Sequence, residues 1–391
     1  MDKPFDFWRD FDLRPRKEKI EKAFNCEKLN SAEDFPVIVS TRNYFAFGSN
    51  PRPLDYWENP AFMLKFQQDY YYEHLKEVQD DLVPYFMPWF GTGVLASGFG
   101  CTWKAPIGNG NDPFVEGHII DKPEEIAGLK LPDPHKDGIM PKVLMFMEYA
   151  KTHGDLPVGP TDLNSPLCTA AQLCGYDNLF VWMYEEPEAI HDLLAMVTEA
   201  FINWVTLQKE YSGEPMDASN GLQGIWSPKG VGVWVSDDDL VSVGGDLYEE
   251  FVVPCYQKLF TAFSGGHLHY CGVGTQHLEN FRKIKGIRAI NNSILGNFKD
   301  FETLAKRRPA GTALEIQDGV TANPEDYFRQ AFANITDFSG IMAGAFALDT
   351  LMLSDTGTYV PAPEGWDPVK AANLTVKGIR AVVAEKLNAA A

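Results

Sequence analysis

The chain of 391 residues is poor in basic residues and has no long apolar run. Lys and Arg number 34 against 54 Asp and Glu, so the formal net charge is −20. Nucleic-acid binding needs a basic face, and a surface this acidic repels anionic lipid. No run of about eighteen apolar residues occurs, and the N-terminus lacks the apolar segment of a signal peptide. We therefore expect a cytoplasmic protein that binds neither nucleic acid nor membrane.

The chain also lacks the cysteine pattern of a disulfide scaffold. Its six cysteines are scattered without framework spacing, which favours reduced thiols or a metal ligand. No Gly-x-Gly-x-x-Gly follows an early strand, which disfavours a dinucleotide-binding fold. Internal repeats, low-complexity segments and long linkers are absent as well.

Short apolar runs alternate with amphipathic helical stretches along the chain, which is 45% hydrophobic. The clearest helix is predicted at Pro187–Lys209, where apolar residues recur at helical spacing and proline stands at the start. Further helices are expected at Leu247–Phe263, Pro324–Ile335 and Pro368–Leu387. The expected strands are Phe35–Tyr44, Leu82–Phe90, Leu156–Leu163, Val231–Val235, His267–Cys271, Ile287–Ile294, Thr312–Gln317 and Ser339–Phe346. This alternation predicts an α/β fold of the (β/α)₈ barrel type.

The expected organisation is one barrel domain over residues 35–391, preceded by an N-terminal helical extension over residues 1–34. The segment Trp89–Pro113 is rich in glycine and aromatic residues and too long for a tight turn. We expect it to lie over the C-terminal mouth of the barrel, where such loops build active sites.

The sharpest chemical signal is the run His267-Leu268-His269-Tyr270-Cys271-Gly272. On a strand, residues two apart point the same way, so His269 and Cys271 would share a face with His267. Imidazole and thiolate are a suitable zinc pair, and zinc needs three or four such ligands. The alternative interpretation is a buried small thiol beside a hydrogen-bonded core histidine.

Polar residues recur where the expected strands end, as a barrel active site requires. Each of them alone is also an ordinary turn or helix-capping residue. Arg42 in the first strand is either a carboxylate or phosphate clamp or a rim ion pair. Aromatic residues beside these positions are candidates for pocket walls, or plain core. The catalytic candidates are Asp162, Asp237 and Glu315, and the substrate-binding candidates are Arg42, Tyr44, Trp89, Asn164, Asn291 and Gln317.

The order of several motifs resembles the uroporphyrinogen decarboxylase superfamily, including its corrinoid-dependent methyltransferases that act on coenzyme M or methoxylated compounds. The matching stretches are Ile119–Asp133, Pro157–Asp177, Ser236–Phe260, His269–Gly272 and Ile294–Asn297. The resemblance implies a (β/α)₈ barrel. For the methyltransferase branch it implies zinc bound through His269 and Cys271, and a corrinoid supplied by a separate protein.

Two departures from the family pattern bear on function. The arginine-rich substrate segment of the decarboxylases is replaced by Ser-Thr-Arg-Asn-Tyr-Phe-Ala-Phe-Gly-Ser-Asn-Pro-Arg-Pro, which leaves Arg42 and Arg52. So few cations argue against a porphyrinogen with many carboxylates. No cysteine follows Cys271, so the later thiolate ligand of the zinc methyltransferases is missing. Asp349 is the favoured replacement as third ligand, ahead of Glu315 and His267, because carboxylate oxygen is an acceptable zinc ligand.

Three functions remain open on these grounds. The first is a methyltransferase that moves a methyl group between a small, methoxylated compound and a separate corrinoid protein, with zinc as Lewis acid. The second is a metal-free decarboxylase or lyase for a small carboxylated substrate. The third is a binding protein that has lost its chemistry. A homodimer is the expected assembly.

Overall fold

A computed structural model describes residues 10–41, 55–105, 113–222, 225–354 and 356–390. Its centre is a curled parallel sheet of six strands in the order β1-β10-β9-β8-β7-β6. These strands are β1 (Val37–Thr41), β6 (Val233–Ser236), β7 (Gly266–Cys271), β8 (Ile287–Ser293), β9 (Ala313–Gly319) and β10 (Ile341–Ala347). They match six of the eight expected strands and are almost entirely buried, as strands covered on both faces are.

The other two expected strands are wrong as regular strands, although both segments occupy the barrel wall. They meet through a single parallel bridge, Phe86 to Val158, and Asn164 bridges to Ser236 of β6. On the other side the backbone N–H of Asp81 donates to the carbonyl of Val37 in β1 at 2.7 Å. Prolines in both segments remove ladder donors, which explains the lack of regular pairing. The bridges connect β1 to β6 and complete the barrel.

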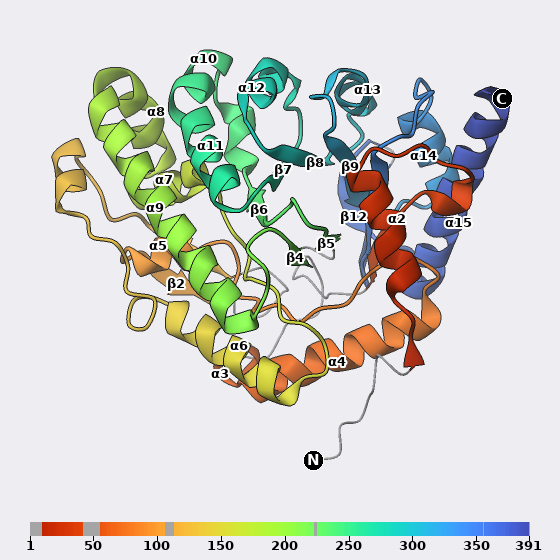
Figure 1. Ribbon diagram of the computed structural model, residues 1–391, viewed down its shortest axis with the longest axis horizontal. Helices are drawn as coiled ribbons and strands as arrows, with labels where there is room; N and C mark the ends of the chain where they lie inside the picture. The colour runs from red at the N-terminus through yellow and green to blue at the C-terminus, as the bar shows by residue number, and fades with distance from the viewer. Residues whose placement is uncertain (1–9, 42–54, 106–112, 223–224, 355, 391) are drawn as a thin grey trace.

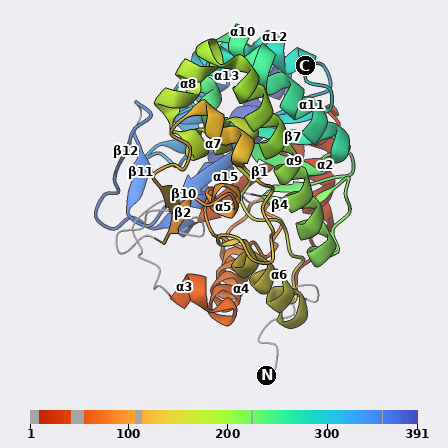
Figure 2. The same cartoon turned by 90° about the vertical axis from the view of Figure 1, so that its left-hand side faces the viewer.

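Helices follow one another in an arc outside the strands (Figure 1). The longest, α9 (Pro187–Ser212), confirms the clearest sequence prediction; it begins at a proline and ends before Gly213, whose left-handed backbone suits glycine. Helices α4 (Pro60–Glu77) and α6 (Met140–His153) pack together, at the lower end of the view in Figure 2. The remaining helices are α2 (Arg14–Phe24), α3 (Asp55–Glu58), α5 (Val94–Gly98), α7 (Pro166–Cys174), α8 (Tyr176–Glu185), α10 (Gly245–Leu247), α11 (Val253–Ala262), α12 (Leu278–Lys283), α13 (Phe298–Arg307), α14 (Pro324–Ala331) and α15 (Pro368–Ala390).

Helix α2 packs across the N-terminal ends of the strands. Its Phe24 ring is fully buried and meets the ring of His267, near the start of β7, edge to face at 5.7 Å. Lys19 donates to the Asp81 carboxylate at 2.9 Å, and Arg16 donates to the carbonyl of Leu82. The expected boundary at residue 34 stays a prediction.

In the described parts of the chain, three small hairpins lie outside the barrel sheet. They are β2 (Thr102–Lys104) with β3 (Phe114–Glu116), β4 (Ser219–Leu222) with β5 (Ile225–Ser227), and β11 (Leu351–Leu353) with β12 (Tyr359–Pro361). In the described part of the glycine-rich segment that begins at Trp89, the chain forms α5 and the first hairpin. Residues 106–112 of that segment lie outside the described residues. None of the described helices is long and apolar enough to cross a membrane.

Candidate metal centre and active-site cavity

A cavity of about 240 Å³ opens at the C-terminal ends of the barrel strands. Strands β6 to β10 each contribute a residue to its wall, and so does the segment that begins at Trp89. The lining residues are Trp89, Gly91, Thr92, Asp162, Ser236, Asp238, His269, Cys271, Ser293, Leu295, Gln317, Phe346 and Tyr359. Aromatic faces thus surround a small group of acidic and hydroxyl side chains.

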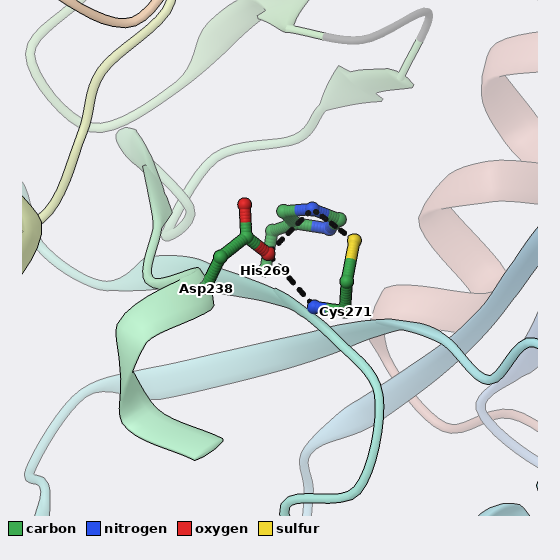
Figure 3. Close-up of side chains that lie close together, drawn as sticks. All are labelled: Asp238, His269 and Cys271. Atoms are coloured by element: carbon green, nitrogen blue, oxygen red, sulfur yellow. Dashed lines mark hydrogen bonds and ion pairs between the residues drawn. The ribbon is translucent and has the colours of Figure 1, made fainter. Parts of the chain in front are cut away.

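Asp238, His269 and Cys271 come together at this mouth, as Figure 3 shows. The two residues of β7 point the same way, as their spacing predicts, and Cys271 Sγ lies 3.6 Å from His269 Nε2. Asp238 Oδ1 is 3.6 Å from the same nitrogen and accepts the backbone N–H of Cys271 at 2.8 Å. One ligand atom from each residue lies within 4.8 Å of the other two.

This donor set fits zinc. Nitrogen, sulfur and carboxylate oxygen are its usual ligands, and three protein ligands are the number that catalytic zinc sites use. The other ring nitrogen of His269, Nδ1, meets Asn291 Oδ1 at 2.5 Å. Because the Asn291 oxygen accepts, Nδ1 carries the hydrogen and Nε2 keeps a lone pair directed toward the cluster. Burial raises the pKa of the Cys271 thiol, and the nearby Asp238 carboxylate raises it further.

Asp349, the favoured third ligand from sequence, is not part of this cluster. It follows β10 in a half-buried bend, and among the described residues Asp238 supplies the third donor. The other two candidates, His267 and Glu315, lie deeper in the barrel. His267 Nε2 is 3.8 Å from Glu315 Oε2, and both side chains are fully buried.

Two of the three catalytic candidates lie outside the cavity wall. Asp237 faces the surrounding helices, where the hydroxyls of Ser165, Tyr248 and Tyr256 donate to it, and burial raises its pKa to about 6. Glu315 lies below the cavity, where burial raises its pKa to about 8. Asp162 does line the cavity; burial raises its pKa to about 6, against opposing hydrogen bonds from Leu163 N–H and Ser236 Oγ.

The substrate-binding candidates divide in the same way. Trp89 and Gln317 line the cavity, whereas Asn164 forms a barrel bridge and Asn291 supports His269. Arg42 and Tyr44 lie outside the described residues. The sequence placed Asp238 among the acidic residues after the strands that could line the pocket, and it gave no indication of Ser236, Ser293, Phe346 and Tyr359. Strand alternation distinguishes Asp238 from Asp237, because residues two apart point the same way and Asp238 therefore shares the face of Ser236.

The fold is that of a (β/α)₈ barrel, and its cavity lies at the C-terminal ends of the strands, where enzymes of this fold have their active sites. A sequence model of the family described as uroporphyrinogen decarboxylase (URO-D) matches residues 86–308, more than half of the chain. The chain therefore belongs to the uroporphyrinogen decarboxylase family, a family of enzymes.

Similarity to solved structures supports the fold. A methyltransferase from Methanosarcina mazei is similar to this chain with a TM-score of 0.65, over 94% of this chain and 99% of that one, at 16% sequence identity. At this identity the likeness shows the shared fold. A comparison with curated protein sequences gives no match.

Proposed function

We propose that the protein is a methyltransferase that moves a methyl group between a small molecule and a corrinoid carried by a separate protein, with zinc held by Asp238, His269 and Cys271. The observation that carries the proposal is the convergence of these three ligand types in one cavity at the barrel mouth. The methyltransferase of the same fold from Methanosarcina mazei supports it, as does the motif order of the chain.

Zinc at this site would act as a Lewis acid on an ether oxygen or a thiol. The carboxylate of Asp238 donates less electron density to the metal than a second thiolate would, which leaves zinc a stronger Lewis acid. Such a site suits activation of an ether oxygen. Asp162 lies in the same cavity and holds a proton more tightly than an exposed aspartate, because burial raises its pKa to about 6. We infer that it gives that proton to the departing oxygen. We therefore infer demethylation of a small methoxylated compound.

The test begins with zinc content. The purified protein should hold one zinc per chain, and Asp238→Ala should lose it while Asp349→Ala retains it. Cob(I)alamin, as methyl acceptor, should then change its absorption spectrum when the zinc protein meets a methyl ether from a defined panel. Metal-free protein that gains nothing from added zinc would overturn the proposal.

A decarboxylase is the second candidate, because the family model is named for one and Asp162 lies in the cavity. An acid that is held partly protonated can protonate the carbanion left by loss of carbon dioxide. Carbon dioxide release from a carboxylated panel that survives chelation would favour this function over methyl transfer.

A further inference from the structure

A strained turn follows β8 at the edge of the cavity. The carbonyl of Ile294 accepts the backbone N–H of Asn297 at 2.8 Å, which closes a turn with Leu295 and Gly296 at its centre. Leu295 has a φ angle of 46° and Gly296 one of 78°. Positive φ is ordinary for glycine but unfavourable for leucine, and turns with two such residues usually carry Asn, Asp or Gly there. Among the described residues other than glycine, three have a positive φ, and of these only Leu295 lines the cavity.

Two buried side chains hold the turn in this conformation. The Leu295 N–H donates to Asp318 Oδ1 at 2.9 Å, and the Gly296 N–H donates to the hydroxyl of Tyr327 at 3.1 Å. The Tyr327 hydroxyl donates in turn to Asp318 Oδ2. Because a backbone N–H can only donate, the contacts with the turn have the same direction whether Asp318 is ionised or protonated. Asp318 of β9 and Tyr327 of α14 thus fix two consecutive peptide groups without lining the cavity themselves.

The β11–β12 hairpin also packs against the backbone of the turn. A Cβ atom at Gly357 in this hairpin would overlap the carbonyl oxygen of Leu295, and one at Gly296 would lie 3.3 Å from the backbone nitrogen of Gly357. This close contact leaves the Leu295 peptide little room to move. Hydrogen bonds and packing together therefore keep a conformation that leucine disfavours, as the surroundings of strained residues at functional sites do.

Leu295 lines the cavity next to the proposed metal ligands. The sheet register pairs Cys271 of β7 with Ser293 at the end of β8, and Leu295 lies two residues further along the chain. It is partly buried and packs against the core, and it also contributes to the wall of the cavity of about 240 Å³. Glycine would adopt the same turn without strain. What leucine adds at this position is a side chain beside the metal cluster.

We propose that Leu295 is a specificity-determining residue whose side chain limits the bulk that a ligand carries next to the metal cluster, and that Asp318 and Tyr327 are positioning residues that hold it there. The consequence is selection by size: the cavity accepts a methyl ether and excludes an ether with a branched alkyl group on the same oxygen. The choice of an ether rests on the proposed function. Size selection at the wall can be measured without metal and without methyl transfer.

The first experiment compares two ligands with the same aryl group and different alkyl groups. Para-fluoroanisole and tert-butyl para-fluorophenyl ether are titrated into metal-free and zinc-loaded protein and followed by fluorine NMR. The wild type should bind the methyl ether at least about tenfold more tightly, and Leu295→Ala should lower this ratio about tenfold. Leu247→Ala is the matched control, because Leu247 is also partly buried but does not line the cavity; it should keep the wild-type ratio.

An unchanged ratio in Leu295→Ala, or a wild type that binds both ethers equally or neither of them, would overturn the proposal. Failure of the proposed function has a different signature. The protein would then bind no zinc or transfer no methyl group, while the metal-free protein would still discriminate between the two ethers.

The second experiment tests the strain in the turn. Denaturant unfolding should give Leu295→Gly an unfolding equilibrium constant about 2- to 10-fold smaller than that of Leu295→Ala, because glycine relieves the left-handed strain that alanine keeps. Equal constants for the two variants would show that the turn holds no strain and would contradict this account of Leu295.

The third experiment tests the positioning role. Tyr327→Phe removes the hydroxyl that accepts the Gly296 N–H, and it should lower the ratio of ether affinities severalfold although Tyr327 does not line the cavity. Tyr256→Phe is the matched control, because it removes a buried hydroxyl that donates to Asp237, away from the turn; it should keep the ratio. A structural role alone would lower the stability of Tyr327→Phe and leave its ratio unchanged, and that result would exclude positioning by Tyr327.

Discussion

The proposed role of Asp162 as a proton donor can be tested directly by substitution. Its side chain lines the cavity, and among the described lining residues it is one of two acidic groups, the other being the proposed ligand Asp238. If Asp162 gives its proton to the leaving oxygen, Asp162→Asn should lower kcat for methyl-ether cleavage by about 10²- to 10⁴-fold. Zinc content should stay at the wild-type level. A variant that keeps its kcat would show that the proton comes from elsewhere.

Asp318 offers a test of buried charge away from the proposed ligands. Its carboxylate accepts from Tyr327, Ser293 and the Leu295 N–H, and burial nevertheless raises its pKa to about 7. A raised pKa stabilises the fold below the unfolded value near 4, and this stabilisation is lost as pH rises through about 7. Urea unfolding should therefore show that Asp318→Asn costs stability at pH 5 and costs less at pH 8, by about 2.5 kcal/mol, since two pH units separate pH 5 from the folded pKa. An equal cost at both pH values would contradict this account.

The sequence predicted some site residues and not others, for reasons visible at single positions. The period-two spacing of His269 and Cys271 sufficed to predict a shared face. Among three consecutive aspartates, however, only the exact end of β6 decides that Asp238 faces the cavity and Asp237 the helices. Tyr359 reaches the cavity wall from the β11–β12 hairpin, which no periodic pattern indicates.

At the scale of elements, the sequence predicted best the strands and helices whose apolar residues recur regularly, because their burial in the core requires that spacing. Strands β7 to β10 and helix α9 appear close to their expected bounds because each carries a continuous buried run or stripe. The two proline-containing segments failed as strands because their prolines remove the N–H donors of a regular ladder. Side chains replace part of the ladder there: Asp80 and Asp81 accept the backbone N–H groups of Val39 and Val37.

Helix α2 should contribute strongly to stability although it lies outside the barrel sheet. Phe24→Ala removes a fully buried ring that packs against His267, which should cost about 3–5 kcal/mol in the free energy of unfolding. The control is Arg14→Ala on the same helix, because Arg14 is exposed and its ion pair is with the nearby Asp12. Denaturant unfolding that gives both variants the same midpoint would show that α2 does not pack firmly on the barrel.

At the scale of the whole molecule, the buried acidic groups and the negative net charge both lower the stability of the fold as pH rises. Asp162, Asp237, Asp318 and Glu315 have pKa values that burial raises to between about 6 and 8, and the chain carries a net charge of −20. Each raised pKa means that stability is lost as pH rises through that value. The Tm of the metal-free protein should therefore increase when pH is lowered from 8 to about 5.5. Repeating the scan in high salt separates surface repulsion, which salt screens, from the buried groups. A Tm that falls over this range would contradict the prediction.

The register of β7, β8 and β9 bears on how such a site is inherited. One residue inserted or deleted within β8 would turn Asn291 to the opposite face of the sheet and separate it from His269. Loops after the strands can change length without this effect, because they lie beyond the paired region. Divergent relatives could thus exchange substrates through their loops while their metal-holding strands keep a constant length. Gap-free alignment across these three strands, rather than overall identity, would then be the signature of shared chemistry.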